Sequence, residues 1–480
     1  MPSTPIPLSV GSYQDADLRA SCRRLVGCFS ESAPSSSFQD SKQPYYQVTF
    51  KPVSIRRFPG TTQLATDGTS NPVRGFREMA GVQYVVIGPT LYTLSSTGTL
   101  TQVGTGITGT GFVRMCDNTE CLFILIPGTS TGYIYTTANG FAPYTDSVFT
   151  GFGAIDVWFI DSYMVFLALD QRTFYNDDGQ VYSGTGPITF TQNAQFSREF
   201  ATDPFVGGCV DHREVLLFGV RTSEGYVNSG NAIGTPFTAA PDTFIEIGAH
   251  PDCAYAIANQ DQSVLWVATD RTVRRRNGQT PQRVSNSGIE NILASANLTG
   301  CYALTPSVAG HPFWILVMPN AQRTICYDCM TGEWFELSTT GLGYWRALCW
   351  YTNFGKQLVG DSQSGAVHYM DTTSSTEFGV AVNQFFVLQT VYAQHNRIAH
   401  RRLELVVTGA GSIKLSVSND SGATWYDRET ITFTPVTGEQ PRAVWMNLGQ
   451  SRDRAYMATI TGTVESFTVD AQLVAAVGVR

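Results

Sequence analysis

The sequence predicts an all-β protein, with a β-propeller of six or seven blades followed by a C-terminal antiparallel β-sandwich. The first observation is a recurring pattern between residues 74 and 372, where short β-type runs form groups separated by Gly, Asn, Asp or Ser turns. A four-stranded unit repeated every ~40–50 residues is typical of a propeller. The second observation is the composition: 12% aromatic residues, 45 glycines and 15% charged residues favour β structure with many turns.

Residues 1–50 are predicted to form an N-terminal arm. They are rich in Ser, Pro and Gln, and show little periodicity outside 17–28. We expect an extended arm or a short helix that lies on another part of the chain.

Residues 51–375 carry the repeat and are predicted to form the propeller. In an early group and in a late group, a first run is followed by a turn, a nearly continuous apolar run, a second turn and a third run. Groups start near Val73, Gly111, Phe152, Phe205, Ile245, Ile289 and Tyr344. Their spacing varies and the turn-rich stretch 176–193 is an insertion, so both six and seven blades fit.

Residues 376–480 are predicted to form the sandwich, after a Thr/Ser-rich linker at 372–376. Residues 402–407 and 414–418 alternate between apolar and polar side chains across a glycine-containing turn. Further β-type runs lie at 429–433, 443–448, 454–461 and 466–474. Six or seven strands in about 100 residues suit a sandwich.

A turn motif of the form S-x-D-x-G-x-T-W runs from Ser418 to Trp425. In this Asp-box, we expect Asp420 to cap a hairpin turn, Gly422 to supply a positive φ, and Trp425 to pack beneath the turn. The motif predicts a structural turn rather than a catalytic site.

Positive charge is concentrated in arginine, because only four lysines occur in the chain. Arginine favours bidentate, partly buried carboxylate pairs, so clustered arginines suit subunit interfaces, with phosphate contact as the alternative. The candidate subunit or DNA contacts are Arg274, Arg275, Arg276, Arg397, Arg401 and Arg402.

The chain is acidic overall, with a formal net charge of -8. Proteins that wrap nucleic acid need a basic surface that releases counterions from phosphate, so the charge argues against this class. An acidic surface can still face DNA that must slide.

The sequence predicts no catalytic, cofactor or metal site. Four residues suggest a sialidase-like set, Arg74, Arg77, Glu78 and Arg346, but their spacing does not require convergence. Carboxylate pairs for glycoside hydrolysis are expected by chance among 39 acidic residues. Cys326 and Cys329 form a lone C-x-x-C without a second ligand pair.

The chain also lacks an N-terminal secretion pattern and any run of about 20 apolar residues. We therefore expect cytosolic synthesis, reduced cysteines and no membrane insertion.

One stretch resembles a known family. Residues 55–62, IRRFPGTT, are followed by Arg74-Gly75-Phe76 and by a glycine and a Leu-Tyr pair at 88–92. This order resembles the opening of the tail hub proteins of short-tailed bacteriophages, also called nozzle or packaged-DNA stabilisation proteins. Residues 415–422 and the strands of 452–473 are similar in order and length, whereas residues 176–300 match in rhythm only.

The resemblance implies a structural virion protein of a podovirus tail and not an enzyme. It implies a homo-hexameric ring below the portal and the tail adaptor, which continues the DNA channel and retains packaged DNA. Expected partners are the adaptor ring, a tail plug or needle, tailspikes or fibres, and DNA passing through the lumen without sequence specificity. The implied location is the virion tail, assembled in the host bacterial cytoplasm.

Two other classes stay open from the residues. One is a propeller-based carbohydrate-binding or glycan-hydrolysing protein. The other is a propeller interaction module of cellular origin, although WD and kelch signatures are not found.

Overall fold

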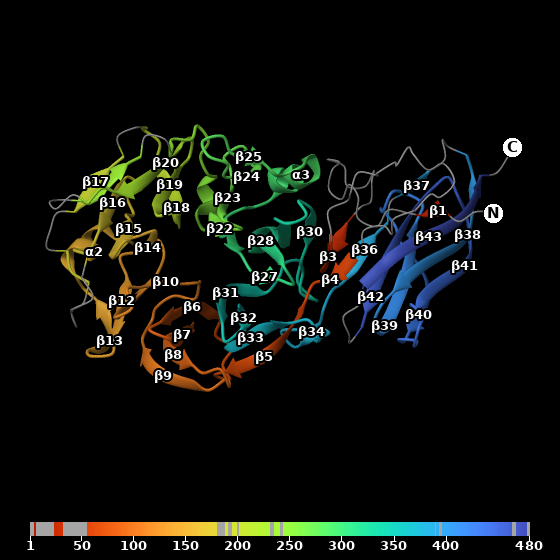
Figure 1. Ribbon diagram of the computed structural model, residues 1–480, viewed down its shortest axis with the longest axis horizontal. Coiled ribbons are helices and arrows are strands. Elements are labelled where there is room, and N and C mark those ends of the chain that lie inside the picture. The colour runs from red at the N-terminus through yellow and green to blue at the C-terminus, as the bar shows by residue number, and fades with distance from the viewer. Residues whose placement is uncertain are drawn as a thin grey trace.

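The computed structural model is a ring of β sheets joined to a second, C-terminal β unit (Figure 1). It describes residues 4–5, 24–31, 55–179, 188–190, 194–198, 201–230, 235–240, 243–388, 390–392, 396–462 and 467–477. The side chains of 4–5, 392 and 467–477 are not described.

The ring contains seven four-stranded units, of which six are separate sheets; we number the units as blades 1–7 along the chain. Blades 1 to 3 are β6 (Val73–Met79), β7 (Val82–Ile87), β8 (Thr90–Leu94), β9 (Leu100–Thr105); β10 (Arg114–Asp117), β11 (Cys121–Leu125), β12 (Gly132–Thr136), β13 (Gly140–Tyr144); and β14 (Asp156–Ile160), β15 (Tyr163–Leu167), β16 (Thr173–Asn176), β17 (Gln195–Ser197). Blades 4 and 5 are β18 (Phe205–Asp211), β19 (Glu214–Gly219), β20 (Ser223–Asn228), β21 (Phe237–Ala239); and β22 (Ala258–Gln260), β23 (Ser263–Val267), β24 (Val273–Arg275), β25 (Gln282–Arg283).

Blade 6 is β26 (Tyr302–Leu304), β28 (His311–Met318), β29 (Arg323–Asp328) and β30 (Trp334–Glu336), with β27 (Ser307–Val308) paired to β28. Blade 7 is β31 (Ala347–Asn353), β32 (Lys356–Asp361), β33 (Ala366–Asp371) and β5 (Gly60–Thr66). Its fourth strand therefore comes from the beginning of the chain. Antiparallel pairing of β5 with β33 closes the ring.

The second strand of a blade is buried on both faces because blades pack against each other. In β7, for example, Val85, Val86 and Ile87 are fully buried. This is why the repeat contains nearly continuous apolar runs instead of an alternating pattern.

Three short helices lie between blades among the described residues, α2 (Ser147–Phe152), η2 (Pro251–Ala256) and α3 (Ser287–Ser295), and η3 (Pro319–Ala321) connects β28 to β29 within blade 6. One of them corrects the sequence analysis, because a strand group was expected to start near Ile289. Ile289, Ile292 and Leu293 instead form the buried face of α3, at helical spacing, and Asn286 caps this helix with a 3.1 Å bond from the Ile289 N–H.

The C-terminal unit consists of two antiparallel sheet regions that share a core. One contains β3 (Cys28–Ser30), β4 (Ile55–Arg57), β43 (Phe467–Val477), β38 (Ile398–Val407) and β41 (Arg442–Ser451), with β1 (Thr4–Pro5) on β43. The other contains β36 (Phe385–Val387), β42 (Asp453–Thr461), β39 (Gly411–Ser418) and β40 (Tyr426–Phe433), with β37 (Val391–Tyr392) on β42. Leu403 and Leu405 of β38 and Ile413 and Leu415 of β39 are fully buried in one cluster.

The N-terminal segment connects the ring to this unit. Strand β2 (Leu25–Val26) pairs with β30 of blade 6 on one side and with β36 on the other, so one sheet of eleven strands crosses the junction. A hairpin of β34 (Thr376–Glu377) and β35 (Val380–Ala381) follows blade 7. The described part of the segment 1–50 that contacts the ring is thus extended.

Aromatic side chains fill the junction. Phe29 lies 5.1 Å from Phe313, and Phe58 lies 5.9 Å from Phe335 and 5.8 Å from Trp345, measured between ring centroids. These residues belong to the same buried cluster as Leu403 and its neighbours. The ring and the C-terminal unit therefore share one hydrophobic core.

The all-β propeller prediction is confirmed, with six separate four-stranded sheets and blade 6 inside the sheet that crosses the junction. Within the described residues, no helix is long and apolar enough to cross a membrane.

Candidate functional site

The first predicted arginine cluster lies on β24 and directly after it. Arg274 pairs with Asp270 at 3.2 Å and Arg275 pairs with Asp261 at 2.8 Å. Arg276 reaches blade 4, where it pairs with Asp211 and Glu214, at 2.9 and 2.8 Å. All three guanidinium groups thus have carboxylate partners within the chain. Their contact with another subunit or with DNA stays a prediction.

The second predicted cluster lies at the C-terminal unit. Arg397 and Arg401 are exposed, whereas Arg402 pairs with Glu404, which also accepts a 2.8 Å bond from Arg442. The structure does not bring the two clusters together, because β24 belongs to the ring and β38 lies at the far edge of the C-terminal unit (Figure 1).

The Asp-box residues form the turn between β39 and β40. Asp420 accepts hydrogen bonds from the Thr424 N–H at 2.9 Å and from the Ser418 hydroxyl at 2.7 Å. Hydrogen bonds from Thr424 and Ser418 lower the pKa of Asp420 to about 2. Gly422 has a φ of 84°, and Trp425 packs against the small cluster of Val387 and Ala455. This geometry is that of a structural turn.

The C-x-x-C motif lies at the end of β29. Cys326 is buried, and the Asp328 carboxylate closes the following turn by accepting the Met330 N–H at 2.9 Å. Across the part of the chain that the structure describes, no group of three or more His, Cys, Asp or Glu side chains is arranged to hold a metal ion.

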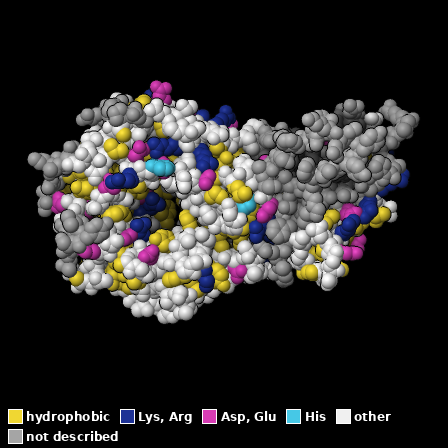
Figure 2. All heavy atoms as spheres, in the orientation of Figure 1, with side chains coloured by type: hydrophobic (Ala, Val, Ile, Leu, Met, Phe, Trp, Pro, Cys, Tyr) yellow, Lys and Arg dark blue, Asp and Glu magenta, His cyan; other side chains and the backbone are white. Residues whose placement is uncertain are grey.

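A concave feature that the sequence analysis missed is the central channel of the ring. The first strands of blades 1, 2, 3, 4, 6 and 7 line a cavity of about 450 Å³, together with Tyr255 of η2. Figure 2 shows this hollow in the ring, with basic and hydrophobic side chains inside it. The lining includes Phe76, Arg77, Phe112, Arg114, Trp158, Phe159, Tyr255, Tyr302, Trp350 and Tyr351.

Arginine–aspartate pairs join neighbouring blades at this channel. Arg77 of blade 1 donates through Nε to Asp117 of blade 2 at 2.5 Å, and Arg114 of blade 2 donates through Nε to Asp156 of blade 3 at 2.6 Å. Burial works against the charged form of Arg114, but Asp156 outweighs it and raises the pKa of the guanidinium. The signal in the sequence was the recurrence of Arg and Asp at the first strand of consecutive blades.

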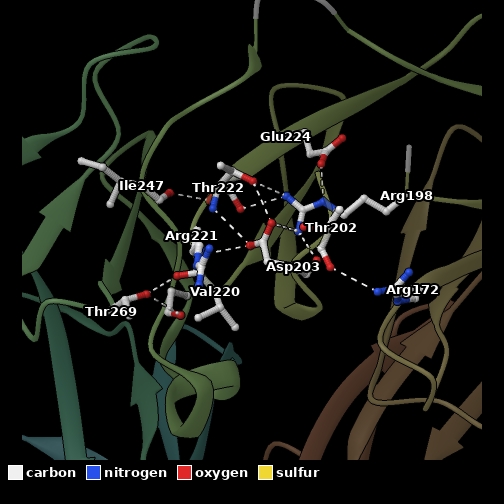
Figure 3. Close-up of polar contacts among 12 residues, drawn as sticks. Arg172, Arg198, Thr202, Asp203, Val220, Arg221, Thr222, Glu224, Ile247 and Thr269 are labelled. Atoms are coloured by element: carbon white, nitrogen blue, oxygen red, sulfur yellow. Dashed lines mark hydrogen bonds and ion pairs between the residues drawn. The ribbon is translucent and has the colours of Figure 1, made fainter. Parts of the chain in front are cut away.

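A larger polar network joins blades 3 and 4 (Figure 3). Arg198 follows β17 and donates through Nε to Glu224 of β20 at 2.5 Å, and through Nη1 to the Asp203 carbonyl at 2.7 Å. Asp203 in turn accepts the Arg221 N–H at 2.7 Å. Arg198 and Glu224 are both almost fully buried, so Glu224 depends on Arg198 for charge compensation, whereas Arg198 also pairs with Asp203 at 3.2 Å.

The residues considered for a sialidase-like site do not form one. Arg74 lines the channel, but its guanidinium donates to the carbonyls of Gly111, Gly88 and Thr108 at 2.6, 2.9 and 2.7 Å. Glu78 accepts the Gly81 N–H in an exposed turn, and Arg346 pairs with Asp361. Only Arg74 and Arg77 reach the same cavity.

Comparison with known proteins identifies the family of this chain. A family model described as the β-propeller of bacteriophage P22 Gp10, from the Phage_stabilise family, matches residues 46–375. None of the curated proteins matches.

Solved structures are similar to this chain at low identity. BamB from Moraxella catarrhalis is 9% identical, covers 66% of this chain and 91% of its own, and has a TM-score of 0.40. Virginiamycin B lyase from Staphylococcus aureus is 9% identical, covers 64% of this chain and 97% of its own, and has a TM-score of 0.42. These likenesses say nothing about function.

Proposed function

We propose a structural role in the tail of a short-tailed phage for this chain, which belongs to the phage stabilisation family of bacteriophage P22 Gp10. In this role, several copies, six by the resemblance of the sequence, form a ring below the portal and its adaptor. The ring continues the DNA channel, retains packaged DNA, and offers its outer face to tailspikes or fibres and its end to a plug or needle.

The observation that carries the proposal is the extent of the family match. Residues 46–375 include every strand of the propeller, from β5 to β33. The family match therefore covers the complete propeller, including the strand that closes it, rather than a few blades that any propeller would share.

The size of the central channel supports passage of DNA between copies rather than through one propeller. A cavity of about 450 Å³ is the size of a small-ligand site, typically about 300–1,000 Å³. It cannot hold duplex DNA, whose major groove alone is about 12 Å wide. A DNA channel thus needs several subunits around a common axis.

The charge of the chain supports a wall that does not hold DNA. A net charge of -8 gives each copy a repulsive field toward phosphate. A negatively charged lumen lets DNA slide, while arginines contact neighbouring copies of the chain.

The shared core supports a rigid subunit. Most interfaces between domains of one chain are modest in size and permit relative motion. Here a continuous sheet and a common aromatic core join the ring to the C-terminal unit. A subunit that seals pressurised DNA benefits from this rigidity.

The deciding experiment uses a phage that encodes this chain and carries a stop codon in its gene. We expect heads that package DNA and then lose it, and particles that lack the end of the tail in electron micrographs. Supplying the intact chain from a plasmid should restore both the nuclease-resistant DNA per particle and the tail. Mutant particles that keep their DNA and infect normally would contradict the proposal.

The assembly of several copies into an oligomeric ring is tested separately by mass measurement of the purified chain, alone and after mixing with the adaptor. Charge reversal at the exposed Arg397 and Arg401 is preferable to reversal at Arg274–Arg276, because Arg274, Arg275 and Arg276 have partners inside the chain. We expect Arg397→Glu with Arg401→Glu to weaken assembly. Unchanged assembly would remove these two residues from the interface.

A further inference from the structure

The central channel contains hydrogen-bond donors that the fold does not use. Arg77 and Arg114 each pair through Nε, and their terminal nitrogens make no hydrogen bond to any described residue. Their side chains are 34% and 37% exposed, although both lie inside the ring. Each guanidinium therefore retains a pair of donors for a ligand.

A third unused donor belongs to Trp158 on β14, which lines the same cavity. The residue is 7% exposed, and its indole Nε1 is buried without a hydrogen-bond partner among the described residues. A buried donor without a partner is unfavourable, so an acceptor supplied by a ligand would be favourable here.

The cavity offers few free acceptors. Asp117 and Asp156 accept from the two arginines, and the hydroxyl groups of Tyr255 and Tyr302 donate to backbone carbonyls at 3.2 and 2.7 Å. Most of the remaining lining is apolar or aromatic, including Phe112, which lies 4.7 Å from Tyr255 in an edge-on contact. A ligand that fits this surface therefore carries a hydrogen-bond acceptor next to an apolar group.

We propose that the central channel binds a peptide segment in which a Glu or Asp carboxylate stands next to an aromatic or aliphatic residue. The carboxylate accepts from the terminal nitrogens of Arg77 and Arg114, because a guanidinium fork matches a carboxylate in geometry and charge. The neighbouring apolar side chain packs on the aromatic lining. This binding site belongs to a single propeller and does not depend on the proposed ring.

The same observations disfavour two other anions. An acidic sugar brings several hydroxyl donors that need acceptors, and the described side chains of the lining offer few of these. Single-stranded DNA needs a basic groove that follows its backbone, whereas the three arginines and two aspartates here leave one net positive charge, which suits one anion. Both are nevertheless included in the test as competitors.

The test is calorimetric titration of the purified full-length chain with N-acetyl-phenylalanyl-glutamate amide. The matched probe has glutamine in place of glutamate and differs only in charge. We expect the glutamate probe to bind about tenfold more tightly or better, since hydrogen bonds to charged groups contribute about 1.5–3 kcal/mol. Equal binding of the two probes, or no binding at about 10 mM, overturns the proposal.

The variants must keep the blades joined. Arg77→Gln combined with Asp117→Asn replaces the ion pair by a neutral hydrogen bond and removes the guanidinium; we expect about tenfold weaker binding of the glutamate probe. Trp158→Phe removes the indole N–H and should weaken binding less. Arg213→Gln is the control, because Arg213 pairs with Asp161 at the surface and does not line the cavity.

Each variant is accepted only if its thermal unfolding matches that of the natural chain. Full binding by a folded Arg77→Gln/Asp117→Asn variant contradicts the proposed site. Tighter binding of N-acetylneuraminic acid or of octathymidylate than of the glutamate probe contradicts the proposed class of ligand.

Discussion

The two sides of the ring differ in the contacts that supplement the apolar packing between blades. Between blades 1 and 5, polar side chains connect each blade to the next: Arg77–Asp117, Arg114–Asp156, Arg198–Glu224 and Arg276–Asp211. Blades 6 and 7 instead share an aromatic core with the C-terminal unit. Polar pairs fix the angle between blades through geometry, whereas the apolar junction supplies burial that is less directional. We expect the junction to set the stability and the pairs to set the shape of the channel.

The most disruptive substitution should lie in the junction. Phe58→Ala removes a fully buried ring that contacts both Phe335 and Trp345. We expect a loss of about 3–5 kcal/mol in the free energy of unfolding. Urea unfolding followed by tryptophan fluorescence and by hydrogen exchange should show the ring and the C-terminal unit weakened together. Weakening confined to one of them contradicts a shared core.

The polar side is tested at Arg198. Arg198→Met leaves the buried Glu224 carboxylate without its partner, which should cost about 3 kcal/mol or more. Adding Glu224→Leu should recover part of this loss, because a well-packed apolar pair can replace a buried ion pair, although Asp203 still lacks Arg198. A double-mutant cycle measured by urea unfolding gives the coupling. If the double variant is as unstable as Arg198→Met, packing around the arginine matters more than its charge.

A buried carboxyl should make the stability of the junction depend on pH, as Asp177 should in blade 3, where burial also raises its pKa to about 7. Burial raises the pKa of Glu377 to about 7, above an ordinary value of 4.5. Its Oε2 accepts from the Trp345 indole at 3.2 Å, and its Oε1 has no partner among the described residues. The folded protein therefore holds a proton that the unfolded chain releases, and stability falls as the pH rises from about 4.5 to 7.

Glu377→Gln should remove this loss, stabilising the protein above pH 7 by about 2–3 kcal/mol. The measurement is the difference in unfolding free energy between the natural chain and the variant across pH 4 to 8. The difference cancels the opposite contribution of His368, whose pKa burial lowers to about 4. A pH-independent difference would falsify the assignment to Glu377.

The smallest effect is expected at the Asp-box. Gly422 has a positive φ, so Gly422→Ala should cost about 1–2 kcal/mol in the C-terminal unit. Gly151 in α2 is the matched control, because a Cβ there meets no atom within 4 Å and its φ lies outside the positive range. Gly151→Ala should be neutral or slightly stabilising. Equal losses in thermal unfolding would argue against a conformational cause.

Local patterns were sufficient for strands and turns. The starts predicted at Val73 and Phe205 coincide with β6 and β18, because each of these strands is followed by a buried, nearly continuous apolar second strand, β7 or β19, which marks the group. The start predicted at Ile289 is wrong, because a short apolar run fits a helix as well as a strand. The channel was missed for a different reason: its residues come from six blades and meet only after the ring closes.

The sequence by itself determined the class of fold and the chemistry available, since strand periodicity, turn residues and the supply of arginine are properties of neighbouring positions. The tertiary structure alone decided which partners meet. Thr62 and Asp371 lie 309 positions apart and still pair across β5 and β33, and β2 enters between blade 6 and the C-terminal unit. No local pattern encodes such pairings, because a strand edge offers the same N–H and C=O groups to every partner and packing of the whole chain selects one.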